Sequence, residues 1–216
     1  NASEIKQLYQ RAWYDNSPQQ FLLHPNIPDQ IDNSTQNTTL LLHFDDGIGA
    51  TTANDSSPYL NDGDVEAGAF FTNDSVSGSA ISFDGVDDFV NLSSKPEWNF
   101  GTEDYSIAWW AKPKSASGGQ STAIGSYTGE NKNSFLFDFL HATDQWRIYI
   151  FNSGGVRADS ACGGMITANS FPEDKWQYVV FVQEADSFKF YVNGIVEKSC
   201  SPFAQDISGN QNLYIS

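Results

Sequence analysis

From residue 39 onward the chain is a succession of short apolar stretches separated by turn-forming residues. Most stretches alternate apolar with polar positions or are rich in β-branched and aromatic residues, and Gly, Asp, Asn or Ser stands between them. They are TLLLHF, SAISF, DFVNL, YSIAWWAKP, STAIGSY, SFLFDFL, WRIYIF, WQYVVFVQ, FKFYVNGIVEK and NLYIS. No segment after residue 39 has the pattern of a long amphipathic helix. This succession predicts an all-β fold, an antiparallel sandwich or barrel.

One turn within this succession has a specific sequence. Asn193 and Gly194 in YVNGIVEK form the strongest short signal for a β-hairpin, because both residues tolerate the positive φ of a tight two-residue turn. We therefore predict a hairpin over this stretch.

The first 38 residues have a different character. Ser3 is a candidate N-cap, followed by apolar residues at helical spacing, so a short helix is predicted. Those apolar residues are Ile5, Leu8, Tyr9 and Ala12. The following stretch, up to residue 38, holds three prolines and many polar residues, which is typical of an irregular arm or linker. The sequence thus predicts a helix and arm over residues 1–38 and one β-domain over residues 39–216.

The charge of the chain excludes some classes of partner. It carries 27 acidic and 11 basic residues, a formal net charge of −16. Binding to nucleic acid or to an anionic membrane surface needs clustered Lys and Arg, so neither is expected. No apolar run approaches the roughly 20 residues of a spanning helix, and membrane insertion is not predicted. The chain starts at Asn1 without an initiating Met or a signal peptide, as expected of a mature chain or of an excerpt.

Signals for N-glycosylation are concentrated in the N-terminal half. The triplet Asn-x-Ser/Thr occurs at Asn1, Asn33, Asn37, Asn54, Asn73 and Asn91. These triplets either belong to ordinary Asn- and Ser-rich loops or are used as acceptors in a secreted or cell-surface protein. Cys162 and Cys200 are either free thiols or a disulfide, and the glycosylation signals favour the disulfide. We therefore expect an extracellular or cell-surface location.

The stretch ISFDGVDDFVNL places three aspartates in one turn between two apolar runs. Gly85 is expected to need a positive φ, and Asp87 and Asp88 to accept backbone N–H groups within the turn. Alternatively, Asp84, Asp87 and Asp88 hold a calcium ion, which takes six to eight oxygen ligands from carboxylates and loop carbonyls. A second acidic group consists of Asp45, Asp46 and Asp55. Calcium is the cofactor that these residues suggest.

The order of the motifs resembles the concanavalin A-like, laminin-G-like jelly-roll domains. The similarity covers about residues 39–216, and its most specific parts are the FDGVDDFV turn and the KWQYVVFV…YVNG hairpin. Further parts are LLLHFDDG, NDSSPYLNDGDVE, EDYSIAWWAKP and NLYIS, in this order along the chain. The resemblance implies an antiparallel jelly-roll β-sandwich of two facing sheets. It also implies carbohydrate binding or protein adhesion, often with calcium, and no catalysis by default.

Two features depart from the family pattern. A strand like NLYIS is normally followed by one more strand and a short helix, whereas this sequence stops at Ser216 and opens with ASEIKQLY, which looks like that helix. The chain is therefore an excerpt, or another subunit donates the last strand to an open sheet edge, or the fold closes differently with the arm. In such a fold Cys162 and Cys200 are expected to border the same sheet, and their bond to serve stability rather than redox catalysis.

Aromatic side chains are the candidates for sugar stacking, which requires an exposed ring with polar neighbours. Trp109 and Trp110 are adjacent on one predicted strand, so one is expected in the core and the other on the outside. Other rings that belong either to the core or to a binding platform are Trp146, Tyr149, Trp176, Tyr178 and Phe190. His43 is expected to be a structural side chain of the first strand, and no HxH, HExxH or CxxC pattern predicts a zinc site.

These observations lead to one expected function and two alternatives. We expect an extracellular binding or adhesion module whose partner is a glycan or an extracellular protein. The first alternative is a structural subunit of an extracellular filament or surface layer, which self-associates by exchange of a strand or an arm. The second is a glycan-active enzyme, but the Glu-x-Asp-x-x-Glu pattern of related glucanases does not occur. The chain is therefore not predicted to be an enzyme.

Overall fold

The computed structural model describes residues 38–115, 119–126, 134–152, 162, 164–201 and 211–216. The helix predicted near the N-terminus and the arm up to residue 37 lie outside the described residues. The helical element of the described part is the short 3₁₀ turn η1 (Pro96–Trp98), and Cys162 also has 3₁₀ conformation. No helix among these residues has the length and apolar character needed to span a membrane.

Fourteen short strands make up the described structure. Those of the first half are β1 (Thr52–Ala53), β2 (Gly63–Glu66), β3 (Phe70–Thr72), β4 (Ala80–Ser82), β5 (Phe89–Leu92), β6 (Tyr105–Ala111) and β7 (Gln120–Gly125). Those of the second half are β8 (Ser134–Leu140), β9 (Gln145–Phe151), β10 (Met165–Ile166), β11 (Gln177–Glu184), β12 (Ser187–Val192), β13 (Ile195–Cys200) and β14 (Leu213–Ile215).

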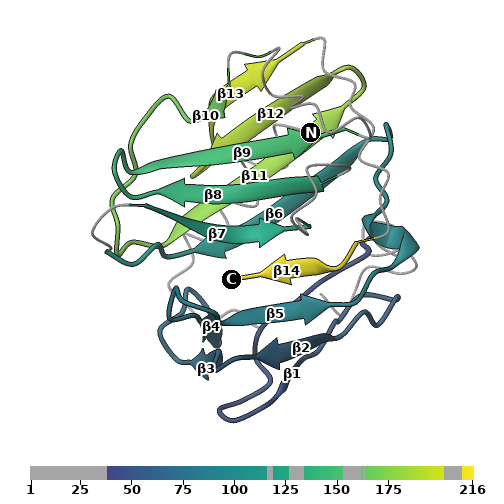
Figure 1. Ribbon diagram of the computed structural model, residues 1–216, viewed down its shortest axis with the longest axis vertical. Coiled ribbons are helices and arrows are strands. Elements are labelled where there is room, and N and C mark those ends of the chain that lie inside the picture. Colours follow the sequence, from purple (N-terminus) through teal and green to yellow (C-terminus); the bar gives the residue numbers. More distant parts are fainter. Residues whose placement is uncertain (1–37, 116–118, 127–133, 153–161, 163, 202–210) are drawn as a thin grey trace, which may run out of the picture.

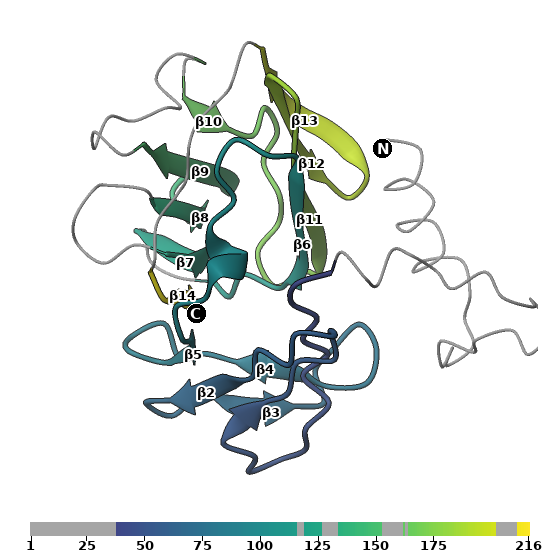
Figure 2. The ribbon, with the colours of Figure 1, turned by 90° about the vertical axis from the view of Figure 1, so that its right-hand side faces the viewer.

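The strands form two facing sheets and a small hairpin (Figure 1). The large sheet has eight strands in the order β1-β2-β5-β14-β7-β8-β9-β10, the small sheet has four in the order β13-β12-β11-β6, and β3 pairs with β4. Every pairing between these strands is antiparallel. Figure 2 shows the sandwich edge-on, with β7, β8 and β9 on one side and β6, β11 and β12 on the other. The predicted antiparallel jelly-roll sandwich is confirmed.

Aromatic side chains fill the space between the two sheets. Alternate positions of β8 point inward and place Phe137 in the centre, with its ring centroid 5.6 Å from that of Phe181 and 6.2 Å from that of Phe190. Phe135 and Phe139, two residues away on either side, are equally buried. Burial of each such ring contributes about 1.5–3 kcal/mol, so this layer is a main source of the stability of the domain.

The turn between β12 and β13 is the predicted two-residue hairpin. Asn193 has φ 51° and Gly194 has φ 79°, as a tight hairpin turn requires. The Asn193 N–H donates to the Tyr178 carbonyl oxygen at 2.8 Å, and the Asn193 Oδ1 accepts from the Tyr178 N–H at 3.0 Å. The turn is thus tied to β11 as well as to its own strands.

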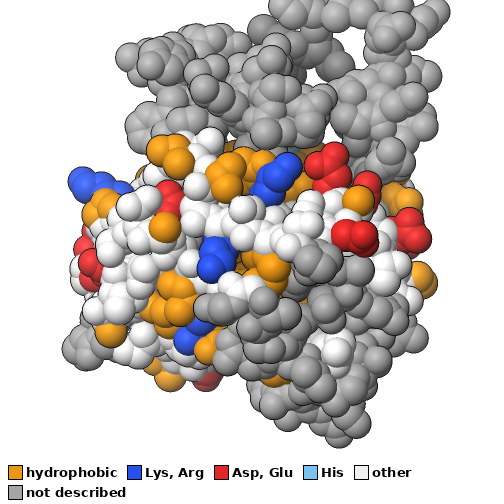
Figure 3. Space-filling view, turned by 90° about the horizontal axis from the view of Figure 1, so that it is seen from above, with side chains coloured by type: hydrophobic (Ala, Val, Ile, Leu, Met, Phe, Trp, Pro, Cys, Tyr) orange, Lys and Arg blue, Asp and Glu red, His pale blue; other side chains and the backbone are white. Residues whose placement is uncertain are grey.

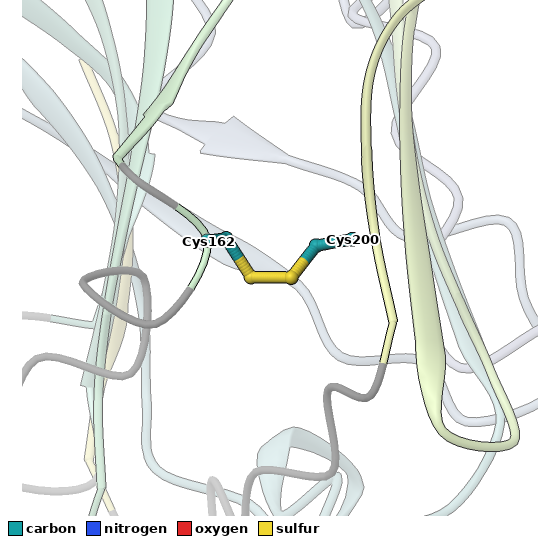
Figure 4. Close-up of a disulfide and its surroundings, with 2 residues drawn as sticks. All are labelled: Cys162 and Cys200. Carbon is teal, nitrogen blue, oxygen red and sulfur yellow. A yellow bond between two sulfur atoms is a disulfide. The ribbon is translucent and has the colours of Figure 1, made fainter.

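Cys162 and Cys200 form the predicted disulfide, with their Cα atoms 5.8 Å apart (Figure 4). The expectation that both cysteines border one sheet is wrong. Cys200 ends β13 at the edge of the small sheet, whereas Cys162 precedes β10 at the edge of the large sheet. The bond therefore joins the two sheets. With a sequence separation of 38 residues, it contributes about 4 kcal/mol in the chain-entropy model.

The first predicted strand, TLLLHF, does not form a strand, and the last, NLYIS, pairs with strands that are distant in the sequence. TLLLHF makes a single isolated bridge, Leu42 to Asp55, while Leu40 and Leu42 pack against the main core. His43 is exposed rather than held inside a first strand as expected. Strand β14 lies within the large sheet, between β5 and β7, and β6 forms one edge of the small sheet.

A buried carboxylate organises the loop between β1 and β2. Asp55 Oδ1 accepts from the backbone N–H groups of Leu41 and Ser57 at 2.8 and 2.9 Å. Its Oδ2 accepts from the Ser57 hydroxyl at 2.6 Å and from the Asn61 N–H at 2.8 Å. Burial raises the pKa of Asp55, but the hydrogen bonds from Ser57, Leu41 and Asn61 together outweigh it and hold the pKa below its ordinary value.

The substitution Asp55→Asn should lower the free energy of unfolding at pH 7 by about 3 kcal/mol, because an NH₂ group would then face N–H and O–H donors. The folded-state pKa of Asp55 lies below its unfolded value. Its contribution is therefore present above about pH 4 and is lost as the pH falls through the folded-state pKa. Urea unfolding should show the difference between wild type and variant shrinking below pH 4.

The matched control is Asp62→Asn, because the Asp62 Oδ1 accepts from the Asp55 N–H and an amide oxygen retains that role. An equal loss of stability in the two variants would contradict the role given to Asp55.

Candidate functional site

The large sheet turns one face outward, and strand register aligns side chains across it. Because neighbouring positions alternate, the inward phenylalanines of β8 leave Leu136 and Asp138 on the outer face. One row of outward positions crosses six adjacent strands. From β2 to β9 it consists of Asp64, Asn91, Tyr214, Gly125, Leu136 and Tyr149. We call these six residues the outer row.

Two tyrosines flank the middle of the outer row. Tyr214 on β14 meets the ring of Phe89 edge-on, with centroids 5.7 Å apart. Tyr149 on β9 lies beneath the guanidinium of Arg147, whose Cζ is 4.2 Å from the ring centroid. Both tyrosines are half-buried. Three strand spacings separate β14 from β9, about 14 Å, which is room for a short oligosaccharide between two aromatic side chains.

Between the two tyrosines, Gly125 contributes no side chain to the outer face of the sheet. A Cβ atom added to Gly125 would lie 2.5 Å from Leu136 Cδ2 and 3.1 Å from the Phe135 carbonyl oxygen. The Leu136 side chain therefore occupies the space above Gly125, and no other residue fits this position without displacing it. The result is an apolar floor between Tyr214 and Tyr149.

A polar network borders this floor. Thr122, Asp138 and Arg147 are register partners on β7, β8 and β9. Asp138 Oδ1 accepts from the Thr122 hydroxyl at 3.0 Å, and its Oδ2 accepts from Arg147 Nη2 at 2.6 Å. Arg147 Nη2 also donates to Gln120 Oε1. The Asp138 carboxylate is fully buried and the Arg147 side chain is 13% exposed, so the pair presents little net charge to a ligand.

Amide groups stand at the other end of the outer row. The Asn212 Nδ2 donates to Asn91 Oδ1 at 3.0 Å, and the Asn212 Oδ1 accepts from the Ser94 N–H at 2.9 Å. Asp64, the register partner of Asn91, is exposed. Aromatic rings with hydroxyl, amide and carboxylate neighbours are the combination that sugar recognition uses.

The structure shows which of the aromatic residues considered for sugar stacking lie in the core and which lie on the surface. Trp109 is a core residue with its ring 4.9 Å from that of Phe137, and Trp110 faces outward on the small sheet, 5.1 Å from the ring of Tyr178. The predicted opposite orientation of the two tryptophans is confirmed. Trp146 and Phe190 are core, Trp176 is half-buried before β11, and Tyr149 alone of this set lies on the outer row.

Sequence reasoning missed Tyr214, Gly125 and Arg147. Their signal is positional: each occupies an outward position of a strand, and only the pairing of β14 with β7 brings Tyr214 beside Gly125. That pairing joins segments about 90 residues apart in the sequence and is not encoded in local spacing.

The acidic turn between β4 and β5 is held by its own side chains. Gly85 has φ 78°, as predicted. Asp84 Oδ1 accepts from the Val86 N–H at 2.7 Å, and Asp88 Oδ2 accepts from the Asp84 N–H at 2.9 Å. The side chains of Asp84 and Asp88, rather than those of Asp87 and Asp88 as predicted, thus accept the backbone hydrogen bonds that hold this turn. One carboxylate oxygen from each of the three aspartates lies within 4.8 Å of the others, a spacing compatible with a shared cation.

The second acidic group does not come together. Asp45 Oδ1 accepts from the Ser79 N–H at 2.6 Å, and Asp46 Oδ1 accepts from the Asn54 N–H at 3.3 Å. Asp55 is occupied by the four hydrogen bonds described above. Among the described residues, the set Asp84, Asp87 and Asp88 is the one acidic group with metal-compatible spacing.

Comparisons with known proteins agree with the fold. A family model described as "Concanavalin A-like lectin/glucanases superfamily" matches residues 84–216. Domain 4 of AbnA, an extracellular GH43 arabinanase from Geobacillus stearothermophilus seen with arabinotriose, is 14% identical; the match covers 75% of this chain and 76% of that one, with a TM-score of 0.52. No curated protein matches the sequence.

Two further solved structures are similar. The binding domain of botulinum neurotoxin serotype D is 12% identical, with 80% of this chain and 44% of that one covered and a TM-score of 0.53. The carbohydrate-binding module CBM66 from Bacillus subtilis is 17% identical, with 68% of this chain and 84% of that one covered and a TM-score of 0.39.

Proposed function

The chain belongs to the concanavalin A-like lectin/glucanase superfamily, and from that premise we propose that it is an extracellular carbohydrate-binding module. The ligand lies along the outer row of the large sheet. The observation that supports this is the pair Tyr149 and Tyr214, which flank the low apolar floor at Gly125 and have polar groups on both sides. The arabinotriose seen with the similarly folded arabinanase domain adds support for a glycan ligand.

We further propose that the bound glycan is neutral. Arg147 is a cationic side chain beside the outer row, and Asp138 neutralises it at 2.6 Å. The net charge of −16 repels acidic sugars at long range. Figure 3, which looks onto the end of the sandwich uppermost in Figure 1, shows basic side chains singly among hydrophobic and acidic ones rather than as one basic patch.

Binding rather than glycoside cleavage is proposed for this face. Retaining and inverting glycosidases need two carboxyl groups about 5–10 Å apart on either side of the scissile bond. Asp138 is engaged by Arg147, and Glu184 lies at the end of β11 on the other sheet. Within the described ranges, the outer row therefore offers no such pair.

Tyr149→Ala and Tyr214→Ala should each lower the affinity for a neutral oligosaccharide about 5-fold, because an aromatic contact with the ligand contributes on the order of 1 kcal/mol. A glycan array that includes arabinan, glucan and sialylated oligosaccharides identifies the ligand, and calorimetry then gives the affinities. Tyr59→Ala, which removes an exposed tyrosine from the loop before β2, is the matched control and should bind like wild type.

Unchanged affinity in both outer-row variants would show that the ligand binds elsewhere. Preferential binding of acidic glycans would contradict the proposed neutrality of the ligand.

An extracellular location fits the disulfide and two of the glycosylation signals. Asn54 and Asn73 are exposed, so we propose that these two carry glycans. Asn91 is half-buried on β5 and bonded to Asn212, and a glycan there would stand on the outer row. Asn1, Asn33 and Asn37 lie outside the described residues. Glycopeptide mass mapping of protein from its source checks the occupied sites.

We propose that a calcium ion binds at Asp84, Asp87 and Asp88. If so, calcium at about 100 times its dissociation constant should stabilise the wild type by about 2.7 kcal/mol relative to EDTA. Asp87→Ala should remove most of that increment, because it deletes an exposed carboxylate of the set that the turn itself does not use. Thermal unfolding in calcium and in EDTA measures the difference, with Asp186→Ala, an exposed turn aspartate, as control. Equal losses in the two buffers would contradict a calcium site in this turn.

The alternative function, a self-associating structural subunit, is favoured by one observation. Strand β6 is the last strand of the small sheet among the described strands, and an edge strand is where another segment can add a strand. Under this alternative, a further strand from another segment or subunit completes the small sheet. Light scattering on protein from its source, with and without EDTA, should give a monomer for a binding module and a larger assembly for the structural subunit.

A further inference from the structure

Three side chains from separate segments meet where β7 begins and β8 ends, at the left of the large sheet in Figure 1. Ser121 Oγ lies 2.8 Å from His141 Nε2, and His141 Nδ1 lies 2.5 Å from Glu173 Oε1. The three residues thus form a hydrogen-bonded chain of hydroxyl, imidazole and carboxylate. This group lies outside the outer row and is not used by the proposed glycan binding.

Strand pairing fixes the relative position of the first two members. Ser121 is the register partner of Phe139, so it stands beside the end of β8, just before His141. The backbone N–H of His141 donates to the Gly119 carbonyl oxygen at 3.2 Å. The imidazole ring packs edge-on against the ring of Phe139, with centroids 5.4 Å apart. The His141 side chain is only 2% exposed, so its orientation is set by these contacts.

The third member sets the tautomer of the imidazole. An ionised carboxylate only accepts hydrogen bonds, so the Glu173 contact requires the proton on His141 Nδ1. Neutral His141 then carries its lone pair on Nε2, which faces the Ser121 hydroxyl. The Ser121 hydroxyl donates to Nε2, and this is the state in which an imidazole removes a proton from a serine nucleophile.

The serine is open to a reactant. Ser121 is exposed, whereas His141 and most of Glu173 are covered. Two residues before it, Gly119 has φ 90°, and a Cβ added there would meet no atom within 4 Å. Because Ser121 is exposed, a reactant can reach its hydroxyl from solvent.

We propose that Ser121, His141 and Glu173 hydrolyse carboxylic esters with a small acyl group. Ser121 Oγ forms a bond to the acyl carbon, and His141 Nε2 takes the hydroxyl proton. The bond from that carbon to the alcohol oxygen breaks, and His141 returns the proton to the departing alcohol. Water then attacks the acyl-serine with His141 as base, releasing the carboxylic acid and restoring Ser121. Glu173 positions the imidazole. The reaction consumes one ester and one water and goes beyond the catalytic inactivity expected from the sequence.

The same contacts also tie β7, β8 and the loop before β11 together, so the test must separate a reaction from a structural role. The probe is a fluorophosphonate, located by mass spectrometry of peptides, with p-nitrophenyl acetate for turnover. Wild type should be labelled at Ser121. Ser121→Ala and His141→Ala should lower kcat/KM about 100-fold or more, since a positioned base contributes roughly 10²–10⁴.

The control variant is Ser115→Ala, which removes a different exposed serine bonded to Asp174 of the same loop, at 2.6 Å. It should keep the labelling and turnover of wild type. Glu173→Gln should lower kcat with KM unchanged, as expected of a residue that acts through His141 rather than on the ester.

Absence of the label from Ser121 in folded wild-type protein would overturn the proposal, and so would equal turnover by wild type and Ser121→Ala. If His141→Ala unfolds, the conservative His141→Gln serves in its place, and labelling of Ser121 in that variant at the wild-type rate would equally overturn it. Thermal unfolding of each variant confirms that the chains compared are folded. Loss of this activity would leave glycan binding at the outer row unaffected, so the two proposals fail separately.

Discussion

The alternation of inward and outward side chains around one aromatic layer governs the rest of this structure. Phe137 between Phe181 and Phe190 fixes which positions of β8 and β11 are buried. A slip of one residue in any strand would turn these rings to solvent, so the register is strongly specified. The same register fixes the outer row, because Leu136 and Tyr149 point outward when the adjacent residues of their strands are buried. The face that we propose as the ligand-binding surface is thus a consequence of how the core is packed.

The carboxylates show how a strongly acidic chain avoids repulsion within its own fold. Asp55 is buried against four donors, Asp138 is paired with Arg147 and Thr122, and Asp88 caps a turn. The carboxylate oxygens of each of these residues accept hydrogen bonds from N–H or O–H groups. Buried Glu197 likewise accepts hydrogen bonds from Asn169, and exposed carboxylates such as Asp62 and Asp64 are screened by solvent. In the turn of Asp84, Asp87 and Asp88, by contrast, three carboxylates approach one another within 4.8 Å.

Local chemistry in the sequence predicted local structure well. The Asn193-Gly194 turn, the positive φ of Gly85 and the opposite orientation of Trp109 and Trp110 follow from the conformational preferences of a few adjacent residues. What could not be predicted depends on which strands become neighbours. Tyr214 beside Gly125, the disulfide across two sheets, and Ser121 beside His141 and Glu173 all join segments distant in sequence. The exposed His43 reflects the same limit, since TLLLHF has the composition of a strand but finds no strand partner beyond one bridge.

The disulfide between Cys162 and Cys200 has a mechanical consequence. The segment that it closes contains β10 of the large sheet and also β11, β12 and β13, three of the four strands of the small sheet. When the chain is pulled from its two ends, the covalent bond carries the tension past this segment. Because the two cysteines are 38 positions apart in the sequence, about 130 Å of extended chain between them is not stretched by the force. Under such a load the domain would therefore extend only through its other strands, and β11 and β12 would stay within the segment that the bond closes.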